Sequence, residues 1–372
     1  MTRIPLPSPP DFTVDWDALD ARFEWVRAMK GVVQDPIHHA EGDVWIHTKM
    51  VCEAMTSLAA FRALPESQRR IAFLGALLHD VGKPGRTQIG EDGRVTSKGH
   101  STHGALLARR ILWRLGIPFE EREQVCALVR HHQEPFWLIE REDPLRLVAA
   151  SSQRVACDLL AILAEADARG RTCADQKKIL DAIDLYRAYA EEQGCLSTPY
   201  AFPSPHARFL YLGGRQSQAT HAPHESFRCE VTLMSGFPGA GKDRWVTTHA
   251  KDLPVVSLDR LRDTLDVDPE DEQGTVVQAA RDEAREHLRA GRSFVWNATN
   301  LSRRIRAMCI RLFADYDAKI RIVYVEVPEP VLHVQNENRP KPVPAKVLEA
   351  LLDRWEVPDP GEAHEIVYAV RA

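Results

Sequence analysis

A glycine-rich segment in the C-terminal half of the chain has the residue types and spacing that bind phosphate. It follows an alternating run that includes Val231 and Leu233, which is typical of a strand, and a helix is predicted directly after it. Small residues let backbone N–H groups surround phosphate oxygens, the lysine reaches the β- and γ-phosphates, and the helix adds its positive dipole end. The predicted nucleotide-binding residues are Gly236, Pro238, Gly239, Ala240, Gly241, Lys242 and Asp243.

Asp243 departs from the phosphate-loop pattern, which has Ser or Thr at this position as a ligand of Mg²⁺. A carboxylate can also ligate the ion, but it adds negative charge beside the phosphates. Strand, loop and helix nevertheless agree with the context that the motif requires. We therefore interpret the segment as a site for ATP or another NTP with Mg²⁺, and not as a chance glycine-rich turn.

The N-terminal half carries a ladder of histidines and aspartates on or beside predicted helices. Imidazole and carboxylate groups together form a ligand set for ions such as Mn²⁺, Co²⁺ or Ni²⁺, and packed helices can bring distant ligands to one centre. Within LGALLHDVGK, the His-Asp pair lies at the end of a buried helix that Gly82 is expected to terminate. The predicted ligands are His47, His79, Asp80, His100, His131, His132 and Asp167.

Two metal ions can be assigned to this ladder. The first would take His47, His79, Asp80 and Asp167. The second would share Asp80 and add His100 with one or both of His131 and His132. Lys83 follows Asp80 by one turn and could neutralise a phosphoryl oxygen. The remaining histidines of this region, His38, His39 and His103, are interpreted as core or surface residues.

A third group follows the phosphate loop. Asp259 lies just beyond a predicted strand end, where α/β sheets bind their ligands, and could accept a proton from an attacking hydroxyl. Arg262 lies three residues later on the same helix face and could hold a phosphate of the acceptor. The alternative is that Asp259 caps the helix and Arg262 is solvated.

The elements that must position these residues fall into two classes. From Trp16 to about Tyr189 the apolar spacing is helical and no convincing strand pattern is found. From residue 229 onward, strands are predicted at 230–235, 254–257, 293–297, 320–327 and 365–370, alternating with helices at 241–250, 259–266, 275–290, 302–316 and 344–355. We therefore predict an all-α domain over 1–193, a connector with little regular structure over 194–228, and an α/β domain with a parallel sheet over 229–372.

Composition sets wider limits. Lys and Arg total 48 and Asp and Glu 53, a net charge of −5 that neither announces nor excludes binding of a nucleic-acid end. The seven cysteines form no CxxC pair and are interpreted as reduced intracellular thiols. The N-terminal stretch lacks the apolar core of a signal peptide, and no run approaches the ~18 apolar residues of a membrane span. The expected location is the cytoplasm, with no membrane partner.

The ladder resembles the HD-domain phosphohydrolase superfamily through the order H…HD…D and the contexts GALLHDVGK, GHSTHGA, LVRHHQ and EADARG. By this resemblance, His100 and not His103 is the ligand of the GHxxxGA pattern. The family's metal activates water and binds phosphate esters.

The loop and the D-x-x-R pair resemble 5′-OH polynucleotide kinases. That family often has Asp where this chain has Asn297, so an acidic contact is missing there. In the lid-like stretch VQNENRPK the resemblance implies Arg339 as the residue that stabilises the transferring phosphoryl group, with Lys341 as the alternative. Arg303, Arg304 and Arg306 could line a groove for the strand or form a solvated face.

The two halves together resemble bacterial fusions of an HD phosphohydrolase with a polynucleotide kinase that heal RNA ends. The resemblance implies a 5′-OH kinase joined to a phosphohydrolase of 2′,3′-cyclic, 2′- or 3′-phosphate ends. It also implies RNA, or DNA, ends as partners and an RNA ligase acting downstream. Two other functions stay open: an HD nucleotidase joined to a small-molecule or nucleoside kinase, and a non-catalytic nucleotide sensor.

Overall fold

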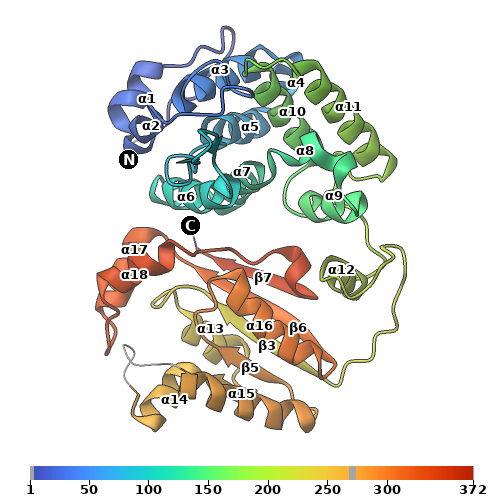
Figure 1. The fold of residues 1–372 in the computed structure, drawn as a ribbon. Coiled ribbons are helices and arrows are strands. Elements are labelled where there is room, and N and C mark those ends of the chain that lie inside the picture. The colour runs from blue at the N-terminus through green and yellow to red at the C-terminus, as the bar shows by residue number, and fades with distance from the viewer. Residues whose placement is uncertain (1–3, 268–273, 372) are drawn as a thin grey trace. The chain divides into compact units, whose positions relative to one another are not determined.

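The computed structural model of the chain describes residues 4–267 and 274–371 and divides into two compact units (Figure 1). Unit 1 is Met1–Ala201 and unit 2 is Phe202–Ala372. The division falls inside the predicted connector, between residues 201 and 202.

Unit 1 is helical, as predicted. Its helices are α1 (Trp16–Arg22), α2 (Glu24–Met29), α3 (Val44–Ser57), α4 (Ala59–Ala63), α5 (Glu66–Leu78), α6 (His100–Arg114), α7 (Phe119–His131), α8 (Glu134–Trp137), η1 (Leu138–Glu140), α9 (Pro144–Ser152), α10 (Cys157–Arg169) and α11 (Gln176–Glu192). Because the sequence of α10 is apolar on most sides, this helix is buried along its length and packs against α3, α5 and α11.

Two glycines of unit 1 allow backbone segments to approach closely. A Cβ on Gly82 would lie 2.2 Å from the carbonyl oxygen of His100, and a Cβ on Gly170 would lie 2.6 Å from the backbone of Val51. The expected role of Gly82 as a helix terminator is wrong, because α5 already ends at Leu78. Gly82 instead lets the turn that carries Asp80 lie against the start of α6.

Unit 1 also contains a short antiparallel pair of strands that the sequence analysis missed. Strands β1 (Gln88–Ile89) and β2 (Val95–Thr96) pair with each other, and the turn between them includes Gly93 at φ 76°. Two residues per strand are too few for an alternating apolar pattern, so periodicity gave no signal.

Unit 2 contains the predicted parallel sheet. Its strands are β3 (Cys229–Ser235), β4 (Val255–Ser257), β5 (Phe294–Asn297), β6 (Ala318–Glu326) and β7 (Glu365–Val370), in the order β4-β5-β3-β6-β7. All four neighbouring pairs are parallel. After β3 the chain forms β4 and β5 on one side of it, and then crosses to form β6 and β7 on the other side. The strand order therefore reverses at β3, and ligands of α/β sheets bind at the carboxyl ends of the strands at such a point.

The helices of unit 2 are α12 (Pro205–Leu212), α13 (Lys242–His249), α14 (Leu258–Leu265), α15 (Gly274–Arg289), α16 (Arg303–Ala314), α17 (Glu329–Glu337), α18 (Ala345–Leu352) and η2 (Pro360–Glu362). The expectation of little regular structure over 194–228 is wrong at α12. The side chain of Ser204 caps this helix by accepting a hydrogen bond from the N–H of Ala207, and Pro205 occupies its first turn. Helix α17 was not predicted.

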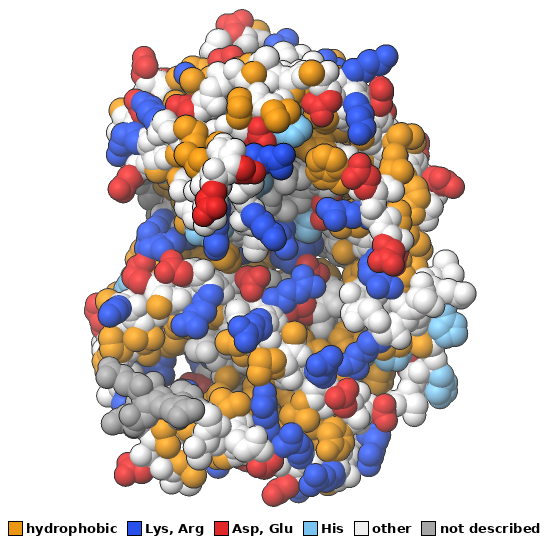
Figure 2. Space-filling view, in the orientation of Figure 1, with side chains coloured by type: hydrophobic (Ala, Val, Ile, Leu, Met, Phe, Trp, Pro, Cys, Tyr) orange, Lys and Arg blue, Asp and Glu red, His pale blue; other side chains and the backbone are white. Residues whose placement is uncertain are grey.

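The surface charge and the apolar content of the helices bear on two features, a nucleic-acid groove and a membrane span. Figure 2 shows acidic and basic side chains interspersed over both units on the face in view. Within the described residues, no single helix is long and apolar enough to cross a membrane, although α9 and α10 pass that test as a pair bent by 105°.

We expect Gly82→Ala to destabilise unit 1, because the added methyl group would meet backbone that cannot move independently. Overpacking of this kind costs about 1–3 kcal/mol, so the calorimetric transition of the full-length protein should shift to lower temperature. Gly85→Ala is the control, since its Cβ would meet only the His103 ring, at 3.0 Å. Equal transition temperatures for the two variants would contradict the close-approach argument.

Candidate active sites

Three histidines of unit 1 share one hydrogen-bonding arrangement. His79 and His132 are the C-caps of α5 and α7, and His100 is the first residue of α6. In each ring Nδ1 faces the backbone carbonyl oxygen three residues earlier, at 2.7 Å for His79, 2.9 Å for His100 and 2.9 Å for His132. Because a carbonyl oxygen only accepts, Nδ1 carries the proton and the Nε2 lone pair is available as a ligand.

The available Nε2 atoms converge on buried carboxylates. His79 Nε2 lies 3.3 Å from His47 Nε2, and His100 Nε2 lies 3.3 Å from Asp80 Oδ1 and 3.5 Å from His132 Nε2. Asp80 Oδ1 is buried and has no hydrogen-bond partner among the described residues. Electron-rich atoms this close, with no donor between them, repel one another unless a cation lies among them. The donor set therefore fits a divalent metal centre.

The pKa values of His132 and Asp80 agree with that interpretation. Burial and the nearby rings of His79 and His100 lower the pKa of His132 to about 3, so this imidazole is neutral, as a ligand must be. Burial, the largest single effect, would raise the pKa of Asp80, but Lys83, His79 and His100 together outweigh it and the pKa lies well below its usual value. Burial likewise acts to raise the pKa of Asp167, but Arg171 and His47 lead the effects that together lower it.

The predicted ligands fall into two groups that share Asp80. One is His47, His79 and Asp80, and the other is Asp80, His100 and His132. Asp167 Oδ1 lies 3.2 Å from His47 Nε2, beside the first group. His131 does not join either group, since its Nδ1 contacts Glu134, so of the two neighbouring histidines only His132 faces the cluster.

The side chain of Lys83 belongs to the same cluster. Its Nζ lies 2.6 Å from Asp80 Oδ2 and donates to Gln34 Oε1 at 2.6 Å. Lys83 therefore neutralises the shared carboxylate, and its contact with a phosphoryl oxygen stays a prediction.

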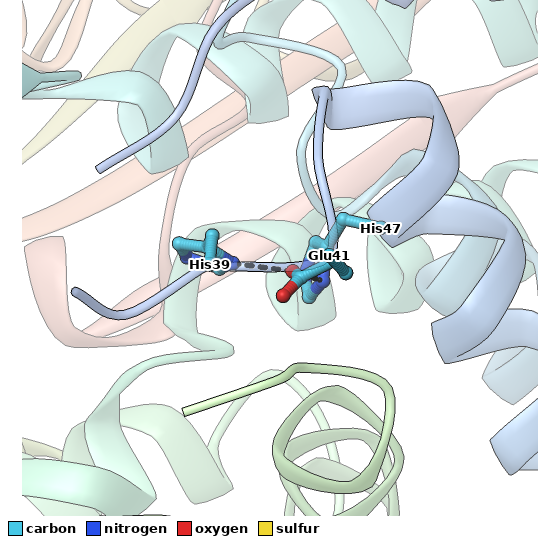
Figure 3. A group of neighbouring side chains, drawn as sticks. All are labelled: His39, Glu41 and His47. Atoms are coloured by element: carbon cyan, nitrogen blue, oxygen red, sulfur yellow. Dashed lines mark hydrogen bonds and ion pairs between the residues drawn. The ribbon is translucent and has the colours of Figure 1, made fainter. Parts of the chain in front are cut away.

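Sequence reasoning missed Glu41 and set aside His39. Glu41 lies between His39 and His47 (Figure 3), with its Oε1 2.8 Å from His47 Nδ1 and 2.9 Å from His39 Nδ1. Its Oε2 accepts the N–H of Thr172 at 2.8 Å. A carboxylate on the far nitrogen of a ligand histidine fixes the ring and its tautomer. Glu41 lies in the loop before α3, and a loop has no periodic pattern of apolar residues that would reveal its contacts.

We expect Glu41→Ala to weaken metal binding by unit 1, because His47 would lose the group that orients its ring. Loss of such a partner typically costs about 10- to 100-fold in metal affinity. The readout is the Mn²⁺ dissociation constant by titration calorimetry. Glu53→Ala, at an exposed position of α3, is the control, and equal affinity of the two variants would contradict the role of Glu41.

In unit 2 the predicted phosphate loop joins β3 to α13. Gly236, Gly239 and Gly241 have backbone φ values of 147°, 84° and 100°, in a region that residues other than glycine rarely adopt. Pro238 and Ala240 complete the turn between them. Lys242 Nζ donates to the carbonyl oxygens of Gly236 and Phe237 at 2.9 Å each, and burial lowers its pKa to about 8.

Asp243 and Asn297 lie in direct contact. The side-chain amide of Asn297, at the end of β5, donates to Asp243 Oδ1 at 2.7 Å. Asp243 is exposed and follows the lysine of the loop in the first turn of α13. A carboxylate therefore lies beside Asn297, the position at which the resemblance to 5′-OH polynucleotide kinases led us to expect an acid.

Asp259 lies on α14 beside two arginines. Arg262 Nη1 contacts Asp259 Oδ1, and Arg339 Nη2 lies 3.8 Å from Asp259 Oδ2. The alternative role of Asp259 as a helix cap is wrong, because Ser257 caps α14 by accepting from the N–H of Arg260. Lys341, the alternative to Arg339, pairs with Asp263 at 2.6 Å.

Arg306 does not line a groove. It is fully buried and ion-paired with Glu362, with Nε–Oε2 at 2.7 Å, and donates to the carbonyl oxygens of Asn300, Leu301 and Glu356. Its role is to fix the segment after α18 against the start of α16.

Together these features define a two-unit protein with a histidine–carboxylate metal centre in one unit and a phosphate loop in the other. Residues 44–171 match the HD domain, and residues 231–358 match an AAA domain. The chain therefore matches an HD domain within unit 1 and an AAA domain, which here contains the phosphate loop, within unit 2.

Three relatives indicate how far this likeness extends. A multifunctional CCA protein of Psychromonas ingrahamii is 29% identical over 48% of this chain and 42% of its own length. A CC-adding tRNA nucleotidyltransferase of Thermus thermophilus is 36% identical over 36% of this chain and 29% of its own. A multifunctional CCA protein of an Acidovorax species is 30% identical over 55% of this chain and 46% of its own length. The chain spans less than half the length of these curated relatives.

We expect Asp243 to act as the metal ligand that replaces the usual hydroxyl. Asp243→Ser should then raise the Mg²⁺ concentration needed for phosphate transfer, because the site loses one negative charge. Adding Asn297→Asp should restore activity by more than the sum of the single changes, as expected for residues that share one role. The measurement is a Mg²⁺ titration of nucleotide-dependent phosphate transfer. If Asp243→Ser leaves that titration unchanged, Asp243 acts only at the helix dipole.

Proposed function

We propose that the protein is a bifunctional RNA end-healing enzyme, a 5′-OH polynucleotide kinase joined to a metal-dependent phosphohydrolase of 2′,3′-cyclic, 2′- or 3′-phosphate ends. The observation that carries the proposal is the arginine pair at Asp259, with Arg262 in contact and Arg339 at 3.8 Å. A nucleoside acceptor has no phosphate for a second arginine to hold, whereas the terminal nucleotide of a strand carries one on its 3′ side.

In the kinase reaction Asp259 accepts the proton of the 5′-hydroxyl as the O–P bond forms to the γ-phosphorus and the bond to the β-phosphate oxygen breaks. Arg262 holds the neighbouring phosphate of the strand, and Arg339 stabilises charge on the transferring group. Lys242 exchanges its two loop carbonyl partners, each 2.9 Å away, for phosphate oxygens.

In the phosphohydrolase reaction the two ligand groups that share Asp80 would hold a divalent ion, which would supply Lewis acidity and activate water. The imidazole-rich donor set suits Mn²⁺, Co²⁺ or Ni²⁺ better than Mg²⁺. The chain's own residues hold the charges: Asp80 is shared between the two ligand groups, and Lys83, 2.6 Å from it, faces the incoming phosphate ester. Water adds to phosphorus and the sugar oxygen leaves as a hydroxyl.

The pairing of the two activities has a chemical reason. Many breaks in RNA leave a 2′,3′-cyclic phosphate on one side and a 5′-OH on the other, and a ligase that joins 3′-OH to 5′-phosphate accepts neither. The relative named as a tRNA nucleotidyltransferase supports RNA, rather than DNA, as the partner. An RNA ligase would act next.

We expect the two activities to separate by mutation. Lys242→Ala or Asp259→Ala should abolish 5′-phosphorylation and leave release of the 3′-end phosphate intact, whereas His79→Ala or Asp80→Ala should do the reverse. One incubation with ATP, Mg²⁺, Mn²⁺ and an RNA with a 5′-OH and a 2′,3′-cyclic phosphate reads both ends. His103→Ala is the control for the histidine changes, because His103 shares the first turn of α6 with His100 and lies outside both ligand groups.

Three experimental outcomes would contradict the proposed function, and two of them would indicate a different one. Loss of both activities in a folded single variant would contradict two independent sites. Faster phosphate transfer to free nucleosides than to a 5′-OH oligonucleotide would indicate a small-molecule kinase. Binding of ATP without its consumption in the presence of RNA ends would indicate a nucleotide sensor.

A further inference from the structure

A cavity of about 490 Å³ in unit 1 extends outward from the metal-ligand cluster. Its lining includes Lys83 and His100 on the side of the cluster, and Phe136 and Trp137 farther along the chain. Ligand pockets for small molecules commonly measure about 300–1,000 Å³. The volume therefore accommodates one nucleotide next to the metal centre, and not a folded nucleic acid.

Trp137 presents an aromatic surface to this cavity. It is 43% exposed, and it has no ring partner among the described residues. The neighbouring Phe136 differs, because it is buried and its ring is covered by the Arg171 guanidinium at 5.1 Å. An indole held at a cavity wall with an open face is suited to stacking on a planar ring, and nucleobases of every type offer one.

Two lysines of the lining are free to bind a phosphodiester. Lys98 precedes α6 and Lys178 lies on α11, and both are exposed without an ion-pair partner among the residues that the structure describes. The lining also contains Asp35, Glu140 and Asp175, so it is not a uniformly basic groove. This mixed charge favours contact with one phosphodiester of a flexible strand end over binding along a duplex.

We propose that this cavity is a subsite for the 3′-terminal nucleoside of an RNA strand, with the nucleobase stacked on Trp137 and the preceding phosphodiester held by Lys98 and Lys178. The terminal phosphate ester then lies at the ligand cluster that includes His100. Trp137 is thus a specificity-determining residue that selects nucleotide ends over simple phosphate esters. The proposal rests on the proposed phosphohydrolase function.

The test compares two RNA oligonucleotides with a third whose terminal ribose is abasic, and all three end in a 2′,3′-cyclic phosphate and carry a 5′-fluorophore. The first two differ only in their terminal base. For the full-length protein, Trp137→Ala should raise KM for both by about 5- to 100-fold, the range for loss of one stacked base, with kcat little changed. Trp137→Phe should retain most of the affinity because a ring remains. Ile139→Ala, an exposed residue two positions away that is outside the lining, is the matched control.

The abasic oligonucleotide isolates the stacking contact. Wild-type protein should bind it as weakly as Trp137→Ala binds the normal RNA, and the substitution should cause no further loss. Equal affinity of wild type and Trp137→Ala for the normal RNA, or equal losses on normal and abasic RNA, overturns the subsite. Lys98→Ala with Lys178→Ala should weaken binding of every RNA and reduce its salt dependence; no change in either would also overturn it.

Binding without turnover separates the subsite from the proposed reaction. Anisotropy of the labelled RNA is measured with chelator present, so that no metal chemistry contributes, and RNA contacts in unit 2 cancel because the variants differ only in unit 1. If wild type releases no phosphate but binds RNA in a base- and Trp137-dependent manner, the subsite stands and the phosphohydrolase proposal fails. If wild type releases phosphate normally and its binding of RNA is independent of Trp137, the phosphohydrolase proposal stands and the subsite fails.

Discussion

The buried carboxylate of Asp80 is the constraint on which unit 1 depends. Each of its oxygens faces a different part of the ligand cluster, Oδ2 toward His47 and His79 and Oδ1 toward His100. A charge removed from water in this way requires a partner of opposite sign, and Lys83 supplies one at 2.6 Å. The backbone segments that carry these side chains must therefore lie close together, and Gly82 permits this approach because it has no Cβ against the backbone of α6.

The sequence predicted which residues of unit 1 meet, but not how each side chain is oriented. The order of histidines and aspartates along the helices placed His47 and His79 in one ligand group, and the resemblance to HD-domain proteins selected His100 over His103 for the second group. It could not choose between His131 and His132, because at the end of a helix neighbouring residues point about 100° apart and the choice depends on where the helix ends. Nor could it find Glu41, whose contact with His47 is made by a loop without periodicity.

In unit 2 the strand β3 and the phosphate loop were predictable because the alternation that includes Val231 and Leu233 indicates a strand and the spacing of the glycines after it indicates the loop. The helix α12 was missed because the predicted connector is rich in proline and glycine, although Pro205 follows a capping serine and begins a helix there. Arg306 was misjudged for a related reason: a charge on a helix is usually solvated, and its partner Glu362 lies 56 positions away in the sequence. Long-range pairs of this kind leave no local pattern.

The division into two compact units also bears on the chemistry. A centre that activates water and a site that holds a phosphoanhydride have opposite needs, since a kinase must keep water away from the phosphoryl group that it transfers. In this chain every described ligand of the histidine–carboxylate cluster lies in unit 1, whereas the loop lysine, Asp259 and Arg339 all lie in unit 2. Each site draws its residues from one unit and is built on that unit's own apolar core. In the proposed function, the residues that would hold a water-activating ion therefore belong to unit 1, and the residues that would bind a nucleotide's anhydride belong to unit 2.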